Sequence, residues 1–392
     1  MKIKITCLVV AFSFLLGCQT TEQKVELTKD YQALLLDSEF PKYKNITIES
    51  EEEIFALNDE MREMIAEEVI PVRDLRERAI KLVTQIFETK DIGLSYVSGA
   101  NLTARQAYQQ NIANCLSLTI MAYALANEAK LNVRFQEVNI PEYWVRQGNF
   151  NMLTGHINLL ISPDENPIRT VVYGKENLVL DFDPFVVKKS FPASLIDKST
   201  VLAMYYNNKG AQALVTSDFS KAYAYLRASL DVDPTFSSAW GNLGLLYRFN
   251  EFHQQAENVY RQAINLNNKN LTAMTNLSVL LKQSGQHEEA REIDRTLDRK
   301  REKNPYYHAV LADEAFFNGE PEKAIQHFKK AIKLDGKVHE FYFGLAKVYY
   351  QLERLEAAQR AMKKAIALNR LPDIENRYNS KLNFLKRVEV TH

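Results

Sequence analysis

Residues 237–270 read SSAWGNLGLLYRFNEFHQQAENVYRQAINLNNKN, and the small residues of this stretch recur along the chain at a constant interval. Ala256 and the earlier Gly244 each belong to a series with a period of 34 residues (256 − 222 = 34). The two series are Ala222, Ala256, Ala290, Ala324 and Ala358, and Gly210, Gly244, Ser278, Ala312 and Ala346. A constant period of this length indicates an array of helix-turn-helix repeats.

The apolar residues of the same stretch resemble the tetratricopeptide repeat, a helix pair of about 34 residues. The matching positions are Trp240, Leu243, Gly244, Tyr247, Ala256, Tyr260 and Ala263. Small residues allow two antiparallel helices to approach closely, and larger apolar residues fill the space between successive pairs. We therefore expect an all-α solenoid of five repeats, 203–236, 237–270, 271–304, 305–338 and 339–372, closed by a capping helix at 373–392.

The third repeat departs from the pattern. Asp294 stands where an aromatic residue is usual, and the unit ends in the charged stretch DRTLDRKREKN. A repeat is stabilised by apolar contacts with its neighbours. We therefore expect the second helix of this unit to be the least well packed of the array.

The resemblance also implies a binding surface, because the first helices of such pairs line a concave groove. The groove positions are Asn207, Arg248, Lys282, Asp313, Phe316, Phe343, Lys347 and Tyr350. Their mixture of charged and aromatic side chains suits a protein or a peptide as partner. The alternative is an array that only spaces or oligomerises the chain.

The first residues, MKIKITCLVVAFSFLLGC, join a basic head to an apolar run that is too short to span a bilayer as a helix, which is typical of a secretory signal. Leu15-Leu16-Gly17-Cys18 resembles the lipobox of bacterial lipoproteins, which implies a signal peptide over 1–17 and lipid on Cys18. Gln19 differs from the Asp that signals inner-membrane retention, so the resemblance implies anchorage at the periplasmic face of the outer membrane. Residues 18–50 are then a polar tether. The alternative is a cleaved signal with an unmodified cysteine.

The segment 51–198 changes from a helical to an alternating hydrophobic period. Ser50 and Glu53 form the pattern of a capping box, which predicts a helix over 52–69 that Pro71 ends. Alternation predicts strands at 132–138 and 156–161, and two more within 170–182. Helices followed by an antiparallel sheet indicate an α+β domain.

Cys115 is the only free thiol that the N-terminal processing leaves, since Cys7 departs with the signal and Cys18 carries lipid. It stands where a polar turn becomes an apolar helix, with Asn111 or Asn114 as the cap. A helix start favours the thiolate, which is the reactive form of cysteine. Cys115 is therefore the candidate nucleophile.

A histidine and an acid complete the pattern of a nucleophilic site. His156 stands at the head of a predicted strand, and Asp181 and Asp183 lie in a later one. Strand alternation places both carboxylates on the same side, so parity does not choose between them.

Three stretches, NLTARQAYQQNIANCLSLTIMAYALANEAKLNVRFQEV, WVRQGNFNMLTGHINLLI and NLVLDFDP, resemble the bacterial transglutaminase-like proteins, over about residues 72–193. The resemblance implies a papain-like fold in which Cys115 is the nucleophile, His156 the general base and acid, and Asp181 the residue that orients the histidine. Members with the acid directly before a proline favour Asp183 instead. Ala113 stands where the family often has glycine.

Composition excludes several other classes of function. Lys plus Arg and Asp plus Glu number 49 each, and no basic block is interleaved with aromatics, so we expect no nucleic-acid partner. Histidines at helical zinc spacing and cysteine pairs are absent from the sequence, so we expect no metal and no cofactor. Three functions remain. The first is a membrane-anchored periplasmic thiol enzyme that hydrolyses amides or transfers acyl groups, and the second is a catalytically inactive scaffold that binds peptide. The third is a redox-responsive binder that uses Cys115 as a sensor.

Overall fold

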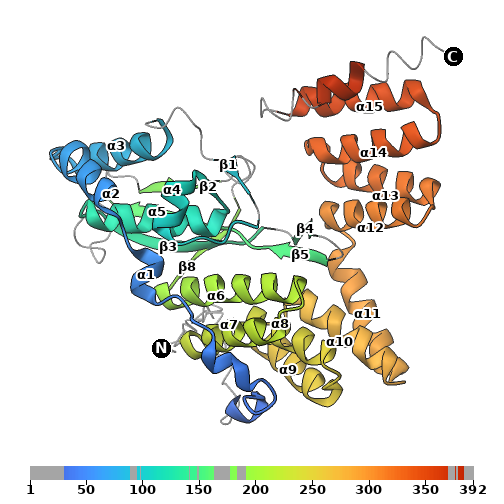
Figure 1. Ribbon diagram of the computed structural model, residues 1–392. Coiled ribbons are helices and arrows are strands. Elements are labelled where there is room, and N and C mark those ends of the chain that lie inside the picture. Colours follow the sequence, from blue (N-terminus) through green and yellow to red (C-terminus); the bar gives the residue numbers. More distant parts are fainter. Residues whose placement is uncertain are drawn as a thin grey trace, which may run out of the picture.

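The computed structural model describes residues 31–88, 95–97, 99–140, 142–147, 150–162, 177–182, 191–369, 376 and 378–383. Figure 1 shows two parts, an N-terminal one of helices and strands and a curved array of helix pairs that begins beside it. The predicted signal, Cys18 and the first part of the predicted tether lie outside the described residues. Among the helices that are described, none is long and apolar enough to cross a membrane.

A four-stranded antiparallel sheet forms the centre of the N-terminal part. Its strands are β3 (Asn132–Val138), β6 (Ile157–Ser162), β7 (Leu178–Leu180) and β8 (Ala193–Ile196), in the order β7-β6-β3-β8. The register opposes Phe135 to Leu159 and Leu159 to Leu180, three buried side chains. The predicted strands at 132–138 and 156–161 correspond to β3 and β6. The first strand expected within 170–182 falls largely outside the described residues.

Helix α5 (Cys115–Glu128) packs against this sheet and is buried along nearly its whole length. A helix that is apolar on all sides needs cover on all sides. The sheet covers one side, while α2 (Asp59–Met64), α3 (Leu75–Glu88) and α4 (Ala104–Gln110) lie against the others. The first residue of α5 is therefore held in a fixed position relative to the sheet.

The helix predicted over 52–69 is divided. The capping box of Ser50 and Glu53 is present and begins α1, which ends at Phe55 (Glu51–Phe55). Asn58 then accepts a hydrogen bond from the amide of Met61 and starts α2, which continues as a π-helical turn over Ile65–Val69. The prediction was wrong here because a second capping side chain lies inside the apolar pattern.

Two short strand pairs were not predicted. Strand β1 (Ser95–Tyr96) runs parallel to β2 (Ile112–Ala113), directly before α5. Strands β4 (Tyr143–Gln147) and β5 (Phe150–Thr154) form an antiparallel hairpin that extends from the N-terminal part toward the array in Figure 1. Both pairs flank residues of the candidate site.

The C-terminal half is an all-α tetratricopeptide-repeat solenoid, as predicted. Its helix pairs are α6 (Lys198–Val215) with α7 (Phe219–Val232), α8 (Ser237–Phe249) with α9 (His253–Leu266), α10 (Leu271–Gln283) with α11 (His287–Arg301), α12 (Pro305–Phe317) with α13 (Pro321–Leu334), and α14 (His339–Gln351) with α15 (Leu355–Leu368). Gly244 shows why the small residues recur, because a Cβ there would lie 2.5 Å from the ring of Tyr260. The helices of a pair touch at that point.

Helix α11, in the third pair, buries fewer side chains than the other second helices of the array. Asp294 is bound by polar contacts instead, since it accepts a hydrogen bond from Ser278 at 2.5 Å and pairs with Lys282 at 2.7 Å. The apolar core divides here, with one cluster reaching Ala290 and another beginning at Ala312. Helix α11 is therefore the least buried of the second helices, although the first helix α12 also buries only three residues.

Residues 31–49, predicted as part of a tether, lie packed against repeats 1 and 2. Phe40 stacks on Tyr223, with ring centroids 4.5 Å apart. The Tyr247 hydroxyl donates to the carbonyl of Leu34 and accepts from the amide of Leu36. The polar composition of the segment concealed this docking, because its few apolar residues are the ones that are used.

Residues 378–383 are helical at the other end of the array, where Tyr378 and Leu382 are buried against repeat 5. The Tyr378 ring stacks on Phe343 at 4.7 Å, and its hydroxyl lies 3.0 Å from Nδ1 of His339. The last apolar face of the solenoid is thereby covered.

Candidate functional site: a thiol, imidazole and carboxylate relay beside a repeat groove

Cys115 is the first residue of α5. Asn114 is the cap, and its side-chain oxygen accepts from the amide of Ser117 at 2.8 Å. Asn111, the other candidate cap, ends α4 with a left-handed backbone (φ 53°). The amide of Cys115 lies in the first turn, where helix geometry supplies no intrahelical acceptor. The thiol is buried, with the residue 6% exposed.

His156 lies directly before β6 and faces the start of α5. Its Nδ1 is 3.3 Å from Sγ of Cys115, and its Nε2 is 2.8 and 2.9 Å from the two carboxylate oxygens of Asp181. Asp181 follows β7, which pairs with β6, so the sheet brings the acid to the histidine. The structure thus brings together three of the predicted site residues in a continuous relay. The other candidate acid, Asp183, lies outside the described residues.

The environment of His156 favours the charged imidazolium. Burial lowers the pKa of His156, but its hydrogen bonds to Asp181 and Cys115, and the electrostatic effect of both partners, outweigh burial and raise that pKa to about 10. Both ring nitrogens of an imidazolium donate, one toward Asp181 and one toward Sγ. Such a donor next to a sulfur stabilises its thiolate form.

Two further contacts bear on the thiol. Sγ of Cys115 also lies 3.2 Å from the carbonyl oxygen of Ile157, to which an S–H group donates. Thr119 donates its hydroxyl to the carbonyl of Cys115 at 2.9 Å. These contacts fix the position of the thiol within the first turn of α5.

Asn158 is a member of the site that sequence reasoning missed. Its Nδ2 donates to Asp181 Oδ2 at 3.0 Å. The signal was its position two residues after His156, which directly precedes β6, because alternation along an extended chain places both side chains on one side. That contact also depends on the pairing of β6 with β7, which the sequence pattern did not reveal.

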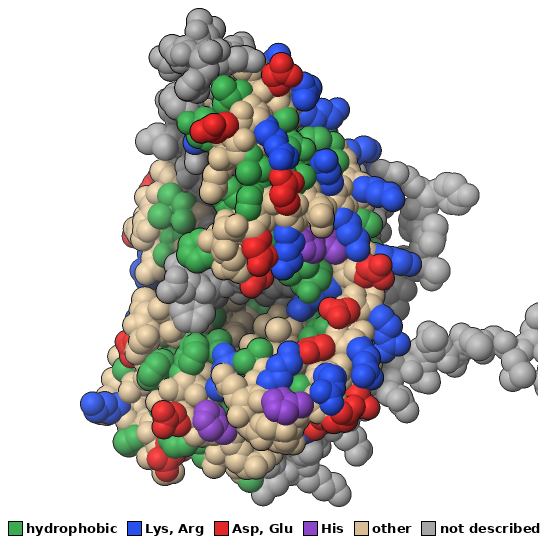
Figure 2. Space-filling model, turned by 90° about the vertical axis from the view of Figure 1, so that its right-hand side faces the viewer, with side chains coloured by type: hydrophobic (Ala, Val, Ile, Leu, Met, Phe, Trp, Pro, Cys, Tyr) green, Lys and Arg blue, Asp and Glu red, His purple; other side chains and the backbone are tan. Residues whose placement is uncertain are grey.

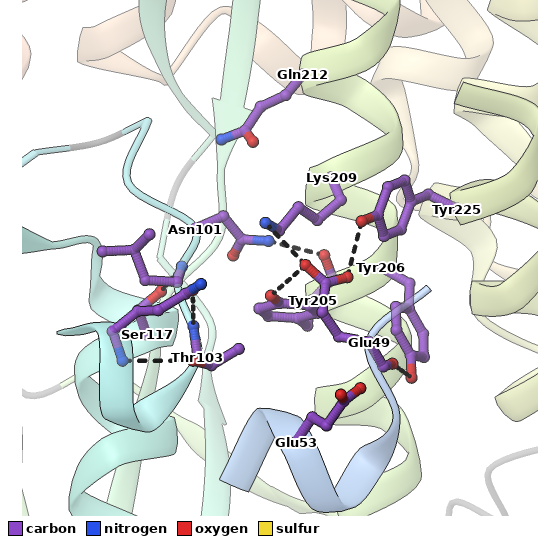
Figure 3. Close-up of polar contacts among 12 residues, drawn as sticks. Glu49, Glu53, Asn101, Thr103, Ser117, Tyr205, Tyr206, Lys209, Gln212 and Tyr225 are labelled. Atoms are coloured by element: carbon purple, nitrogen blue, oxygen red, sulfur yellow. Dashed lines mark hydrogen bonds and ion pairs between the residues drawn. The ribbon is translucent and has the colours of Figure 1, made fainter. Parts of the chain in front are cut away.

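The loop at residues 99–101, which lies before α4 and contacts the start of α5, is attached to the first repeat, as Figure 3 shows. The carbonyl of Ala100 accepts from the amide of Asn114 and from the hydroxyl of Ser117, which ties the loop to the start of α5. From the other side, Asn101 donates to the carbonyl of Tyr205 at 2.9 Å, and Gln212 donates to the carbonyl of Gly99. Helix α6 therefore supports the nucleophile's loop.

Glu49 lies at the centre of this joint (Figure 3). Its carboxylate accepts from the hydroxyls of Tyr225 (2.7 Å) and Tyr205 (3.4 Å) and pairs with Lys209 at 3.3 Å. Burial raises the pKa of Glu49. The hydrogen bonds from Tyr225 and the backbone and the charge of Lys209 lower that pKa by more than burial raises it, so the net shift is downward. A carboxylate is thereby held at the meeting point of the N-terminal segment and repeat 1.

A second joint connects the β4–β5 hairpin with repeats 3 and 4. The Arg301 guanidinium donates to both carboxylate oxygens of Glu142, at 2.8 and 3.1 Å, and to the Thr275 hydroxyl at 2.9 Å. Asn304 donates to the carbonyl of Glu142 at 2.9 Å. The array therefore holds a chain segment before Cys115, at residues 99–101, and another after it, at Glu142.

The predicted groove residues fall into two groups. In the first repeats, Asn207 is buried and accepts from Asn242, Arg248 is half-buried, and Lys282 pairs with Asp294 of its own unit. Asn207 and Lys282 therefore contact other residues of the array, and Arg248 is partly buried within it.

In repeats 4 and 5 the predicted groove residues come together. Lys347 pairs with Asp313 at 3.4 Å and lies 5.8 Å from the ring centroids of both Phe316 and Phe343. Tyr350, one turn further along α14, is 41% exposed. Asp313, Phe343 and Lys347 also line a hollow of about 200 Å³ between α12 and α14.

The surface around this region is of mixed character. Figure 2 shows positive and negative side chains interspersed with hydrophobic ones on the face that it presents. Among the described residues, no group of three or more His, Cys, Asp or Glu side chains is arranged to hold a metal ion.

Comparison with known proteins identifies the array. The tetratricopeptide repeat family matches residues 253–314 and 316–376. A protein O-mannosyl-transferase of Caenorhabditis elegans is 36% identical over 64 residues, which cover 16% of this chain. The chain spans only 9% of the length of that relative.

Among solved structures, PilF of Pseudomonas aeruginosa is similar over 50% of this chain and 89% of its own, with 16% identity and a TM-score of 0.31. A thermophilic TPR protein of Thermus thermophilus is similar over 46% and 98%, with 20% identity and a TM-score of 0.30. YrrB, described as a TPR protein with an unusual peptide-binding site, is similar over 45% and 92%, with 18% identity and a TM-score of 0.25.

The C-terminal half is thus an array of tetratricopeptide repeats, a class of domain that binds proteins or peptides. The chain carries such an interaction scaffold next to a buried relay of thiol, imidazole and carboxylate.

Proposed function

We propose that this protein is a transglutaminase-like thiol enzyme that acts on amide bonds and recruits a protein partner through its repeats. The observation that carries the proposal is the relay from Cys115 Sγ through His156 to Asp181, at 3.3 and 2.8 Å. Nucleophile, base and orienting acid within hydrogen-bond reach are the arrangement that covalent acyl transfer requires. The proposed catalytic domain spans 51–198 and has a papain-like fold.

The reaction follows from the roles of these groups. The Cys115 thiolate attacks the amide carbonyl carbon, and the first-turn amide of α5 donates to the oxyanion. The C–N bond then breaks while His156 gives its Nδ1 proton to the leaving amine. A thioester remains on Sγ. Water, or a second amine, attacks the thioester and returns a proton to His156, which releases a carboxylic acid or a new amide together with the thiolate.

Alkylation of Cys115 tests the proposal in protein that begins after Cys18, where Cys115 is the only thiol. We expect the rate of reaction with iodoacetamide, measured as a function of pH, to depend on the imidazolium donor of His156. His156→Ala should lower the rate at neutral pH and alter the pH profile, because that donor is lost. His253→Ala, an exposed histidine of the array, is the control.

A profile that His156→Ala leaves unchanged would sink the enzyme proposal and favour the inactive scaffold. One observation supports that alternative: the thiol is buried and lies at 3.2 Å from the Ile157 carbonyl, which suits a neutral S–H donor. In the alternative, the N-terminal part binds peptide without turnover and the repeats recruit a second protein.

The partner surface that we propose is the groove of repeats 4 and 5, around Asp313, Phe316, Phe343, Lys347 and Tyr350. Its half-buried rings of Phe316 and Phe343, the exposed Tyr350 and its charges suit a peptide segment. Phe316→Ala with Tyr350→Ala should abolish capture of partners by the Cys115→Ala protein. Partner capture that survives both changes would exclude this groove as the binding surface.

The lipobox resemblance of Leu15-Leu16-Gly17-Cys18 supports anchorage at the periplasmic face of the outer membrane. Cys18→Ser should abolish incorporation of labelled fatty acid into the protein, because the Cys18 thiol is the proposed acylation site and acyl chains hold such proteins by burial of many methylenes. Fatty-acid labelling that persists in this variant contradicts the proposed anchor.

A further inference from the structure

Asn158 contacts the relay without being one of its three members. Its Nδ2 donates to Asp181 Oδ2 at 3.0 Å, and the residue is 5% exposed. His156 approaches the same carboxylate from another direction, with Nε2 2.8 and 2.9 Å from its two oxygens. The carboxylate is therefore held between an imidazole and an amide that both come from the start of β6.

The other end of the Asn158 amide makes no comparable contact. Its Oδ1 is buried and accepts no hydrogen bond from any residue that the structure describes. A buried acceptor left unpaired destabilises a fold, whereas an apolar side chain of similar shape at the same place is nearly neutral or stabilising. Stability alone therefore does not explain an asparagine at this position. Its one recorded polar contact is with Asp181.

We infer that Asn158 is a positioning residue of the relay. Its N–H group fixes the rotation of the Asp181 carboxylate, so that both oxygens face Nε2 of His156. The imidazole then keeps Nδ1 turned toward Sγ of Cys115. The inference rests on the proposed function, because the position of the ring matters only if the pair of thiol and imidazole reacts.

Asn158→Leu is the direct test, because leucine retains the shape and removes both the donor and the unpaired acceptor. We expect the alkylation rate of Cys115 at neutral pH to fall about tenfold, which is the size of effect expected for a lost hydrogen bond to a charged group. The midpoint of urea unfolding should change little, because removal of the unpaired Oδ1 offsets the loss of the hydrogen bond to Asp181. Ser162→Ala, on the same strand face and also buried, is the control and should alter the rate less than about twofold.

Asn158→Asp gives a second readout that a purely structural role would not produce. At acid pH the introduced carboxyl group is protonated, and its O–H donates to Asp181 as the amide did. At higher pH it ionises beside the Asp181 carboxylate, and two carboxylates at this distance repel each other. We expect the ratio of variant to wild-type alkylation rates to be near one at low pH and to fall as pH rises.

The outcomes separate this inference from the proposed function. If His156→Ala changes the wild-type profile but Asn158→Leu leaves the rate unchanged, and the rate ratio of Asn158→Asp is flat with pH, then Asn158 does not position the relay. If His156→Ala changes nothing, the proposed function fails and this inference fails with it. Should Asn158→Leu not fold, the pH dependence of the ratio for Asn158→Asp decides alone.

Discussion

Repeats 1 and 2 and repeats 4 and 5 follow the same 34-residue pattern, but their surroundings differ. In repeats 1 and 2, the joined half, the N-terminal segment covers the helices, and Phe40 is only 6% exposed among their rings. In repeats 4 and 5, the open half, Phe317 is 75% exposed. The pattern determines how helices pair, whereas segments outside the pattern determine which faces are covered. Residues 31–49 cover faces of the joined half, whereas the open half exposes Phe317 and Tyr350.

Removing one aromatic ring from each half should give the largest contrast. Phe40→Ala is expected to lower the free energy of unfolding by about 3–5 kcal/mol, because it leaves a cavity among Tyr223, Tyr247 and Phe252. Phe317→Ala is expected to change it by less than about 0.5 kcal/mol. Urea denaturation measures both. Similar losses in the two variants would show that the halves are covered alike.

Ion pairs of repeat 3, where the hairpin joins the array, and of the open half provide the next comparison. Arg301→Ala leaves the Glu142 carboxylate without its partner at the largely buried joint beside the hairpin, and we expect a loss of about 3 kcal/mol. Lys347→Ala breaks an exposed pair with Asp313 in the open half and should remove about 0–1 kcal/mol. Thermal unfolding of both variants gives the difference. A larger effect from Lys347→Ala would show that the joint at Glu142 stabilises the fold less than the open half does.

The pH dependence of stability that arises from Glu49, in the joined half, should be a smaller effect than the two above. The pKa of Glu49 is lowered in the folded state, so Glu49 stabilises the fold above the ordinary carboxyl pKa of 4.5 and loses this effect as pH falls through the lowered pKa. Tyr225→Phe should weaken that dependence and lower the unfolding free energy by about 1.5 kcal/mol, because it removes a hydrogen bond to a charged group.

Tyr206→Phe is the matched control for this experiment. Its hydroxyl donates to the backbone carbonyl of Glu49 at 2.7 Å rather than to the carboxylate. It should lower stability equally at all pH values between about 3 and 7. An unchanged acid dependence in Tyr225→Phe would mean that the carboxylate is not linked to the joint.

The smallest expected effect lies in the open half, at His327. Burial lowers the pKa of His327, and the charges of His308, Lys323 and Lys330 lower it further. The unfolded chain therefore takes up a proton first, and stability falls as pH drops below 6.5 toward the lowered pKa. His327→Gln should reduce this slope slightly in urea unfolding series, while the exposed His253→Gln of the joined half should not.

The sign for His156 is the opposite. Its pKa is raised to about 10, so its contribution to stability is present below pH 6.5 and is lost as pH rises through about 10.

For the His327 test, a fall in stability on acidification that His327→Gln leaves unaltered would exclude His327 as its source.

The sequence revealed the parts of the fold that depend on local periodicity. The 34-residue spacing of small residues predicted the array because close helix contact admits few side chains, as Gly244 shows against Tyr260. Alternation predicted β3 and β6. It failed for the hairpin of β4 and β5, whose position is determined by the contact of Glu142 with Arg301, 159 residues further along the chain. Contacts of that range leave no local periodic signal.

For the candidate site, the order of Cys115, His156 and Asp181 agreed with the juxtaposition that the structure has. Strand alternation could not decide between Asp181 and Asp183, because residues two apart in a strand point to the same side. Asn158 escaped notice since its contact depends on the register of two strands. A site residue that acts through a neighbouring strand becomes visible only when the pairing is known.

The apolar core that surrounds α5 includes Val201, Leu202, Tyr205 and Tyr206, all from the first helix of the array. The two parts are therefore not separable modules for protein engineering. A chain cut near residue 198 removes these four side chains from the core that holds Cys115. Transfer of the thiol-bearing part to another protein would require the first repeat to be included.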